Sequence, residues 1–485
     1  MRWLGEFLTA ASSKPALICL FLILAAPPIF HMSRLTPPGQ APDEPAHLVR
    51  AEGLLLGAVL AVRKYGPDGN PPRLAAVAGI KVNPGITRIV FNRPPLPTDH
   101  YQIQLTDQPG LMWLTYHQPR MFMTIDNTAQ YFPAAYLPAT AGLAIGLAFH
   151  QPPRRCFQFA RYGMMLAYLL IGATAIFLAP GGESVFLSIL FLPIPLFLAG
   201  TVSEDGVLIA AACLAAALFA RDPEEHKFSR LFALLILTLI LGAKAPYIPL
   251  AALALIPLSK PYFRARLFQM LCVITPVLIW AGIITALVAV PFLRPPYHPG
   301  PLYAGDHTIL LNSTSVTKNL AILLAQPSRF ITMPAHLTSL AAVQWGREII
   351  GILGNLQLQF PDAFYVNWWL ALLIAALGAA FPARTRAIAA PVTPATSLFI
   401  LAIIALTIWA IMISMYLSWT DIGKAVIDGI QGRYFVLLLP FLALAIPRTS
   451  LRIPAIIPSL PALAMAAFDV DYLPTRVWEN FAAMH

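Results

Sequence analysis

Apolar runs follow one another along most of this chain, and each is long enough to cross a membrane or nearly so. Only 11% of the residues are charged, against about 25% in a soluble domain, so most of the chain must face lipid or other membrane helices. The mean hydropathy of +0.70 agrees with that conclusion. The runs predict an all-α polytopic membrane protein. After a first run that ends near Phe30, we place them at residues 162–179, 184–200, 206–220, 229–243, 246–258, 270–292, 366–381, 395–418, 434–447 and 453–468.

The net charge and the cysteines indicate neither nucleic-acid binding nor a metal or redox site. The formal net charge of +10 comes from 32 basic and 22 acidic residues. In a membrane protein such an excess usually lies in cytoplasmic loops, so it does not indicate nucleic-acid binding. The four cysteines lie far apart and form no metal or redox motif. We interpret them as packing residues; they are Cys19, Cys156, Cys213 and Cys272.

The apolar runs and the polar stretches between them predict one integral membrane domain over residues 1–485. The first run lacks a small-residue cleavage site, so we expect a retained span with a cytoplasmic N-terminus. Two long polar stretches are expected to be outer loops. The predicted parts are a first outer loop at 33–130, an interfacial helix at 131–149, a core bundle at 162–292, a second outer loop at 293–365, C-terminal spans at 366–468 and a tail at 469–485.

The topology depends on run 131–149, which suits a helix at the interface as well as a spanning one. Basic loops at 221–230, 259–266 and 382–386 should be cytoplasmic. They fall inside only if 131–149 does not cross, although Arg154, Arg155 and Arg161 then lie outside against the usual trend. This choice predicts about eleven spans with the C-terminus outside.

The most polar stretch of the first outer loop is Ala41-Pro-Asp-Glu-Pro-Ala-His-Leu-Val-Arg-Ala-Glu52. Pro45 after an acidic pair is a helix-start signal, and it places Asp43 at or next to the cap of a helix over about 46–62. Glu44, His47 and Arg50 recur every three residues, so they share one side of that helix. We expect Glu44 to cap the helix, and His47 and Arg50 to hold the two carboxylates. The pattern fits a well-capped interfacial helix and a catalytic acidic cluster equally well.

Three further polar residues interrupt or border apolar runs on the same predicted side. Asp205 is a functional candidate because a carboxylate at the membrane is costly, yet it and Ser203 are also good helix caps. Lys244 stands beside the helix-breaking Pro246, which favours an anion site over snorkelling to the headgroups. Arg433, which precedes Tyr434, is either a phosphate-binding fork or an ordinary interfacial residue.

Together these residues would place acids and cations at one surface. That combination suits group transfer from a phosphorylated donor. A carboxylate takes the proton of an acceptor hydroxyl, while cations hold the departing phosphate.

Five ordered motifs carry a resemblance to a known family. They are Pro-Asp-Glu-Pro-Ala-His-Leu-Val-Arg, Tyr131-Phe-Pro-Ala-Ala-Tyr-Leu-Pro, Ser203-Glu-Asp-Gly, Lys244-Ala-Pro-Tyr and Gln431-Gly-Arg-Tyr-Phe435. From about residue 20 to 447 the chain resembles an uncharacterised family of bacterial multi-pass membrane proteins labelled as a domain of unknown function. That family in turn looks like the GT-C superfamily of polyprenyl-phosphate-dependent glycosyltransferases.

The GT-C resemblance implies roles for the candidate residues. Asp43 would be the base, with Glu44 as second choice, and Asp205 would orient donor or acceptor. Lys244, Arg433 and Tyr434 would bind the donor phosphate, supported by His47, Arg50 and Ser203.

It also implies partners and a location. The partners would be a polyprenyl-phosphate sugar donor, membrane lipids and a glycan or lipid acceptor, in the cell envelope at the bacterial inner (cytoplasmic) membrane. We expect no cofactor and no obligatory metal. The alternatives are a transporter or flippase of lipid-linked saccharides and a non-enzymatic membrane assembly subunit.

Overall fold

The structure is a computed structural model that describes residues 2–68, 73–91, 119–223, 226–258, 260–290, 314–381, 392–449 and 451–482. Six of its helices are long and apolar enough to cross a membrane. The pair α9 (Pro193–Ala199) and α10 (Glu204–Phe219), bent by 119°, makes a seventh candidate if it counts as one span. The six are α2 (Lys14–Leu35), α7 (Pro153–Leu178), α12 (Phe263–Leu287), α15 (Asp362–Ala379), α16 (Pro394–Ser418) and α19 (Ile456–Ala482).

The prediction of about eleven spans was therefore wrong, because several apolar runs are not long continuous helices. Run 184–200 divides at Pro193 into α8 (Glu183–Phe191) and α9. Run 246–258 forms a 3₁₀ helix, η2 (Ala245–Leu255), which contains Pro249. Proline removes a backbone donor and favours such breaks. Run 434–447 is likewise divided into α17 (Arg433–Val436), α18 (Leu439–Leu442) and η4 (Ala443–Ala445).

Other boundaries also differ from those predicted. Helix α11 (Lys227–Ala243) has 17 residues, short of the roughly 20 that a simple crossing needs. Helix α19 continues through the predicted tail as far as Ala482. The predicted second outer loop holds α13 (Val316–Ala325) and α14 (Arg329–Ile350), while its residues 293–313 lie outside the described ranges.

The first predicted loop is not helical throughout, so the prediction of an all-α fold needs correction. Strands β1 (Val62–Asp68), β2 (Arg73–Val82) and β3 (Met121–Thr124) form an antiparallel sheet in the order β1-β2-β3. Ala78, Ile80 and Val82, which share one face of β2, are buried, while Lys81 is exposed. In the chain, β1 and β2 lie between α3 (Glu44–Leu55) and α4 (Pro84–Phe91), and β3 follows α4.

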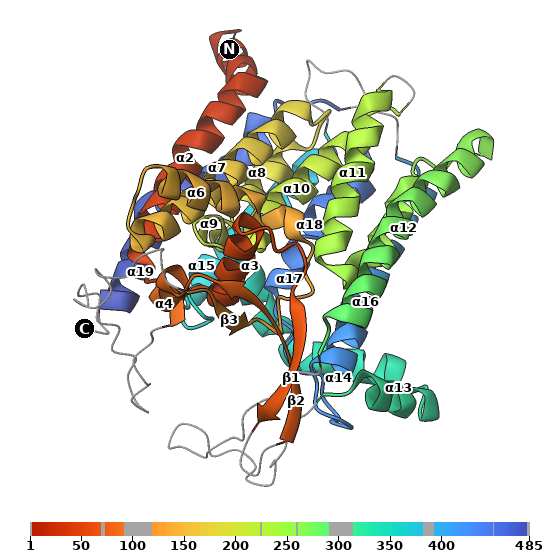
Figure 1. Ribbon diagram of the computed structural model, residues 1–485. Coiled ribbons are helices and arrows are strands. Elements are labelled where there is room, and N and C mark those ends of the chain that lie inside the picture. Colours follow the sequence, from red (N-terminus) through yellow and green to blue (C-terminus); the bar gives the residue numbers. More distant parts are fainter. Residues whose placement is uncertain are drawn as a thin grey trace.

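Helix α3 is shorter than the helix expected over residues 46–62. It ends at Leu55, two residues before Gly57, whose φ of 86° is a left-handed conformation that glycine adopts at little cost. Figure 1 shows the β1–β2 hairpin and α13 at one end of the bundle, with the N-terminal helix α1 (Arg2–Ala11) at the other. We call the end that carries α3 and the hairpin the site end.

Run 131–149 forms the 3₁₀ helix η1 (Pro133–Tyr136) and helix α6 (Leu137–Ala148), which are too short to be candidate spans. Helix α6 packs closely on α7. A Cβ added at Gly142 would lie 2.1 Å from the carbonyl oxygen of Phe159, and one at Gly163 would lie 2.1 Å from that of Pro138. Small residues allow such an approach between membrane helices.

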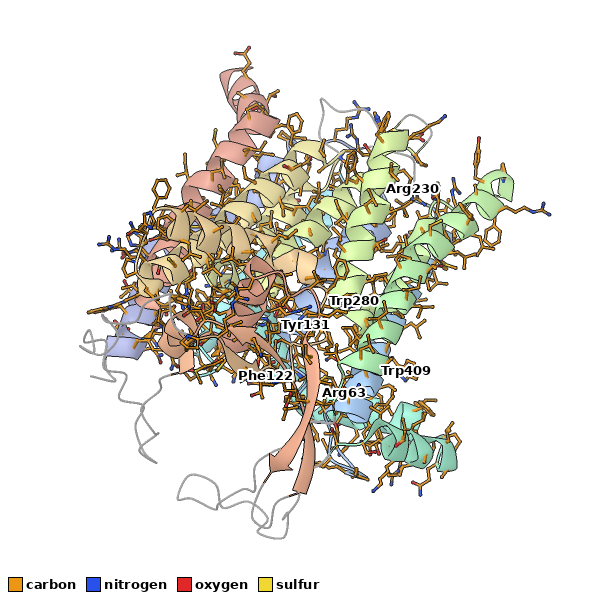
Figure 2. All side chains as sticks on the ribbon, in the orientation of Figure 1. Arg63, Phe122, Tyr131, Arg230, Trp280 and Trp409 are labelled. Carbon is orange, nitrogen blue, oxygen red and sulfur yellow. The ribbon has the colours of Figure 1, made fainter. Side chains whose placement is uncertain are left out.

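The first loop is fastened to the spans at the site end. Arg63 of β1 donates a hydrogen bond to the carbonyl of Thr285 in α12 (2.9 Å), and the indole of Trp280 donates to the carbonyl of Gln130 (3.2 Å). Figure 2 places Arg63, Trp280 and Tyr131 near one another, with Arg230 of α11 towards the opposite end. These contacts hold the loop over the bundle.

Candidate functional site

Asp43 occupies the N-cap position of α3, but its side chain does not cap that helix. Its φ is 56°, a left-handed conformation that aspartate tolerates better than most residues, and its side chain makes no capping hydrogen bond. One carboxylate oxygen accepts a hydrogen bond from Asn127 (2.9 Å), and the other lies 3.4 Å from a guanidinium nitrogen of Arg433. The Asp43 side chain is 46% exposed.

Lys244 follows the last residue of α11 and is paired with two consecutive carboxylates. Its ammonium lies 2.8 Å from Asp205 and 3.0 Å from Glu204, both in the first turn of α10. The hydroxyl of Ser203 caps that helix by accepting from the backbone N–H of Asp205 (3.3 Å). Ser203 therefore is a helix cap, and Lys244 is largely covered and pairs with two carboxylates.

Arg433 begins α17 and lies between the other charged groups. Besides Asp43, it approaches Asp205 at 3.7 Å, which is an ion pair without a hydrogen bond. Its side chain is only 4% exposed, and its Nε and Nη1 atoms have no hydrogen-bond partner among the described residues. Arg433 is thus held by two long ion pairs, and its Nη1 faces the Asp205 carboxylate at a distance too long for a hydrogen bond.

Helix α14 holds the backbone next to Arg433 in place. The carboxylate of Glu348 accepts a hydrogen bond from the backbone N–H of Gly432 and another from Gln344 (3.1 Å). A Cβ at Gly432 would lie 2.3 Å from the carbonyl oxygen of Trp345, so glycine is required for this approach.

Glu44, the second candidate base, is not available to a substrate. It is fully buried and forms two hydrogen bonds with Arg161 of α7, at 2.8 and 2.7 Å. Its oxygens also accept from the backbone N–H groups of Gly39 (3.0 Å) and Val202 (3.1 Å). The expectation that Glu44 caps the helix was wrong. The Glu44–Arg161 ion pair explains how the charge of Arg161 is accommodated at the site end.

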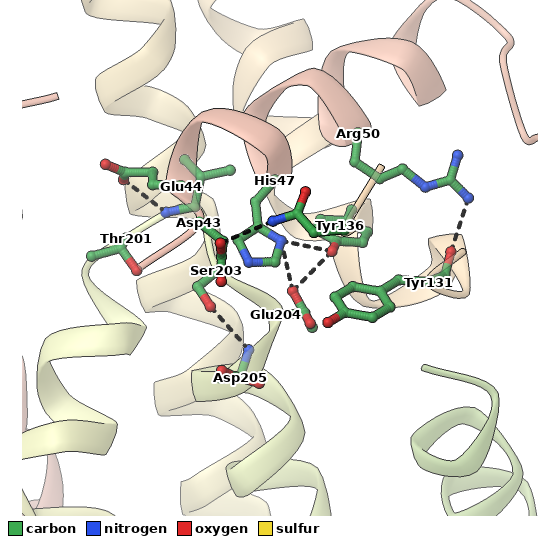
Figure 3. Close-up of polar contacts among 12 residues, drawn as sticks. Asp43, Glu44, His47, Arg50, Tyr131, Tyr136, Thr201, Ser203, Glu204 and Asp205 are labelled. Atoms are coloured by element: carbon green, nitrogen blue, oxygen red, sulfur yellow. Dashed lines mark hydrogen bonds and ion pairs between the residues drawn. The ribbon is translucent and has the colours of Figure 1, made fainter. Parts of the chain in front are cut away.

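The expectation that His47 and Arg50 hold Asp43 and Glu44 was also wrong. The Nδ1 atom of His47 lies 2.9 Å from Glu204 and 2.8 Å from the hydroxyl of Tyr136, which itself donates to Glu204 (2.8 Å). Figure 3 shows these three side chains converging. Arg50 instead donates to the carbonyl of Tyr131 (2.9 Å).

Aromatic rings surround the ammonium of Lys244. It lies 4.8 Å from the ring centre of Tyr131 and 5.9 Å from that of Tyr434, distances at which a cation is attracted to a π-system. The ring of Tyr434 is also 5.5 Å from the guanidinium carbon of Arg433. Tyr247 donates to the carbonyl of Tyr434 (2.7 Å) and so fixes α17 against η2.

We call the six linked ionisable residues the charged cluster. It holds three carboxylates against two permanent cations, and a protonated imidazole would bring the charges into balance. Burial alone lowers the pKa of His47, but the neighbouring carboxylate of Glu204 raises it above its ordinary value of 6.5. Burial also acts to lower the pKa of Lys244, but Asp205 and Glu204 outweigh that effect and raise it, so Lys244 stays charged. The charged cluster consists of Asp43, His47, Glu204, Asp205, Lys244 and Arg433.

The sequence analysis missed Glu204, the residue that joins His47 to Lys244. Its only signal was its place beside Asp205 in the quoted Ser-Glu-Asp motif. Tyr131 and Tyr136 were likewise inside a quoted motif without an assigned role. Within the described ranges, no group of three or more His, Cys, Asp or Glu side chains is arranged to hold a metal ion.

The fold and the site define a mostly helical membrane protein that crosses the bilayer several times and gathers buried charges at one end. Residues 30–442 match the model of a family described as "Predicted membrane protein (DUF2142)". That match covers most of the chain, so the chain belongs to this family, as the resemblance indicated. Comparison with curated proteins and with solved structures finds no match.

Proposed function

We propose that this protein is a membrane glycosyltransferase of GT-C type. It moves a sugar from a polyprenyl-phosphate-type lipid donor to an acceptor hydroxyl on a glycan or lipid, at the outer face of the bacterial inner membrane. The observation that carries the proposal is the contact between Asp43, the exposed acid of the charged cluster, and Arg433, a buried cation whose ion pairs with Asp43 and Asp205 are long.

The transfer needs a base at the acceptor and cations at the leaving group. Asp43 takes the proton of the acceptor hydroxyl, whose oxygen forms a bond to the anomeric carbon of the sugar. The bond from that carbon to the phosphate oxygen breaks, and its electron pair leaves with the lipid phosphate. Arg433 and Lys244 stabilise the negative charge on that phosphate.

Each of the other cluster residues then has a supporting part. Glu204 and Asp205 hold Lys244 in place, and Asp205 also approaches Arg433. His47 and Tyr136 fix the Glu204 carboxylate. A phosphate that enters between Arg433 and Lys244 would replace the loose contact of Arg433 with Asp205.

A second candidate function is transport of lipid-linked saccharides across the membrane. The sharply bent pair of α9 and α10 favours it, because broken spans beside buried charges are common in transporters. The exposed Asp43 next to a cation favours bond cleavage, since transport needs no base at the surface.

Reconstituted vesicles separate these functions. Purified protein is incubated with a polyprenyl-phosphate sugar labelled in the sugar, together with envelope glycan and lipid acceptors. A glycosyltransferase releases polyprenyl phosphate and moves the label to an acceptor. Movement of intact donor across the bilayer without release would support the transporter. If the donor is neither cleaved nor moved, an assembly subunit is favoured.

A further inference from the structure

Arg50 is a buried cation that the charged cluster does not use. Its side chain is fully buried in α3, and its Nη2 donates to the carbonyl of Tyr131. Its Nε and Nη1 atoms have no hydrogen-bond partner, and no ion pair joins it to a carboxylate in the part of the chain that the structure describes. The sequence had suggested the acidic pair as its partner, but Glu44 pairs with Arg161 instead.

A guanidinium in this position calls for a negatively charged partner. Burial lowers the pKa of Arg50, but arginine stays protonated in proteins. A buried charge without a counter-charge is costly, and burial is normally offset by an ion pair and satisfied donors. The two unused donors of Arg50 are therefore available for an anion that is not part of this chain.

The position of Arg50 connects it to the charged cluster through one residue. Tyr131 accepts from Arg50 with its carbonyl, while its ring lies 6.3 Å from that of His47 and 4.8 Å from the ammonium of Lys244. Figure 3 shows Arg50 on the same helix as His47. In this view Tyr136 lies between Glu204 and Arg50. Arg433 differs from Arg50 in having two carboxylates nearby, Asp43 at 3.4 Å and Asp205 at 3.7 Å.

We propose that Arg50 binds a second phosphate group, so that the donor is a lipid diphosphate sugar. This inference rests on the proposed glycosyltransferase function and specifies its donor. The first phosphate lies between Arg433 and Lys244, and the second reaches the fork of Arg50, which suits phosphate oxygens. The electron pair of the broken sugar–oxygen bond then leaves with a lipid diphosphate, and the acceptor proton goes to Asp43. A monophosphate donor would leave Arg50 unpaired.

Binding of two product lipids tests the inference. Purified protein in nanodiscs is titrated with polyprenyl diphosphate and polyprenyl monophosphate of equal chain length. Wild type should bind the diphosphate about ten- to a hundredfold more tightly, the size of a charge-assisted contact. Arg50→Gln should remove that preference and leave monophosphate affinity unchanged, whereas Arg433→Gln should weaken both.

The outcomes distinguish this inference from the proposed function. Equal affinity for both lipids in wild type, or a diphosphate preference that persists in Arg50→Gln, overturns the second phosphate site while the glycosyltransferase proposal stands. If wild type binds neither lipid, both are overturned.

Thermal unfolding provides a readout that does not depend on a lipid. Inorganic pyrophosphate should raise the Tm of wild type more than that of Arg50→Gln, which keeps only the first phosphate site, whereas inorganic phosphate should shift both equally. Without ligand, Arg50→Gln should unfold at the same or a higher temperature, since it removes an uncompensated charge. A large drop in Tm would identify Arg50 as a structural residue. A shift of wild type with glucuronate but not pyrophosphate would assign Arg50 to a carboxylate on the acceptor and overturn the diphosphate.

Discussion

The guanidinium of Arg433 lies 3.4 Å from the carboxylate of Asp43, although 390 positions separate the two residues in the chain. Asp43 precedes the first helix after α2, and Arg433 begins the short α17 near the end of the chain. The site is therefore complete only when both parts of the chain have folded together. The proposed function depends on this contact between Asp43 and Arg433.

The two cations should respond differently to replacement. Arg433→Gln should weaken donor binding about ten- to a hundredfold with little change in stability, because its ion pairs are loose. Lys244→Met should also destabilise the protein by roughly 3–5 kcal/mol, since it leaves Glu204 buried without this counter-charge. Lipid binding and thermal unfolding measure the two effects.

A second substitution separates folding from binding at Lys244. Adding Glu204→Gln should restore most of the stability of Lys244→Met but not its donor affinity. Lys424→Met is the matched control, because its partner Asp428 lies four residues away on the surface. Normal donor affinity in both Arg433→Gln and the double variant would show that these cations do not bind phosphate.

Glu44 should be needed for folding and not for chemistry. Glu44→Gln leaves Arg161 buried without its counter-charge and should cost roughly 3–5 kcal/mol of unfolding free energy. Asp362→Asn, which breaks the ion pair of Arg347 with an 80% exposed aspartate, should cost less than about 1 kcal/mol. If the two variants unfold alike while Glu44→Gln loses turnover, Glu44 acts in catalysis after all.

Glu52 should make stability depend on pH. Burial raises its pKa from 4.5 to about 8. One carboxylate oxygen accepts from the backbone N–H of Asn83 (3.0 Å), and the other has no partner among the described residues. Because the folded state binds this proton more tightly, stability is full below about pH 4.5 and falls as the pH rises to about 8.

The measurement is thermal unfolding of wild type and Glu52→Gln between about pH 4.5 and pH 9, a range that spans both pKa values. Glu52→Gln cannot ionise, so it should be the more stable protein above about pH 8, by a few kcal/mol. The difference between the two curves isolates Glu52 from other groups that titrate. Glu479→Gln, at an exposed ion pair, should follow the wild-type curve. Parallel curves for Glu52→Gln and wild type would contradict the raised pKa.

The orientation of the site end is testable by cysteine labelling. Val59 is exposed shortly before β1 at the site end, and Phe228 is exposed at the start of α11. An impermeant thiol reagent added to intact cells should label Val59→Cys and not Phe228→Cys. The reverse pattern would place the site at the cytoplasmic face and remove the outer-face reaction. Arg386, which we also expect to be cytoplasmic, lies outside the described residues.

The sequence indicated which polar residues could meet but not how they pair. Asp205, Lys244 and Arg433 each interrupt or border an apolar run, and such positions are costly unless the charges find partners. The choice between Asp43 and Glu44 depends on the left-handed turn at Asp43 and on Arg161 from another helix, and neither is visible in the local pattern.

The number of membrane spans could not be predicted from the sequence for a related reason. Apolar composition predicts burial in lipid or protein, but it does not distinguish a continuous span from short helices packed inside the bundle. Pro193 and Pro440 lie where such runs divide. The three-stranded sheet was missed because the alternation in β2 is short and rich in alanine, which is a weak strand signal.

The most direct test is turnover by Asp43→Asn, which keeps the shape of the side chain and removes its basicity. With a labelled polyprenyl-linked sugar donor, release of the lipid phosphate should fall on the order of a hundredfold or more, with donor binding little changed. Near-normal turnover in Asp43→Asn together with loss in Asp205→Asn would assign the base to Asp205 in the first turn of α10. Near-normal turnover in both variants would contradict the glycosyltransferase reaction and favour transport.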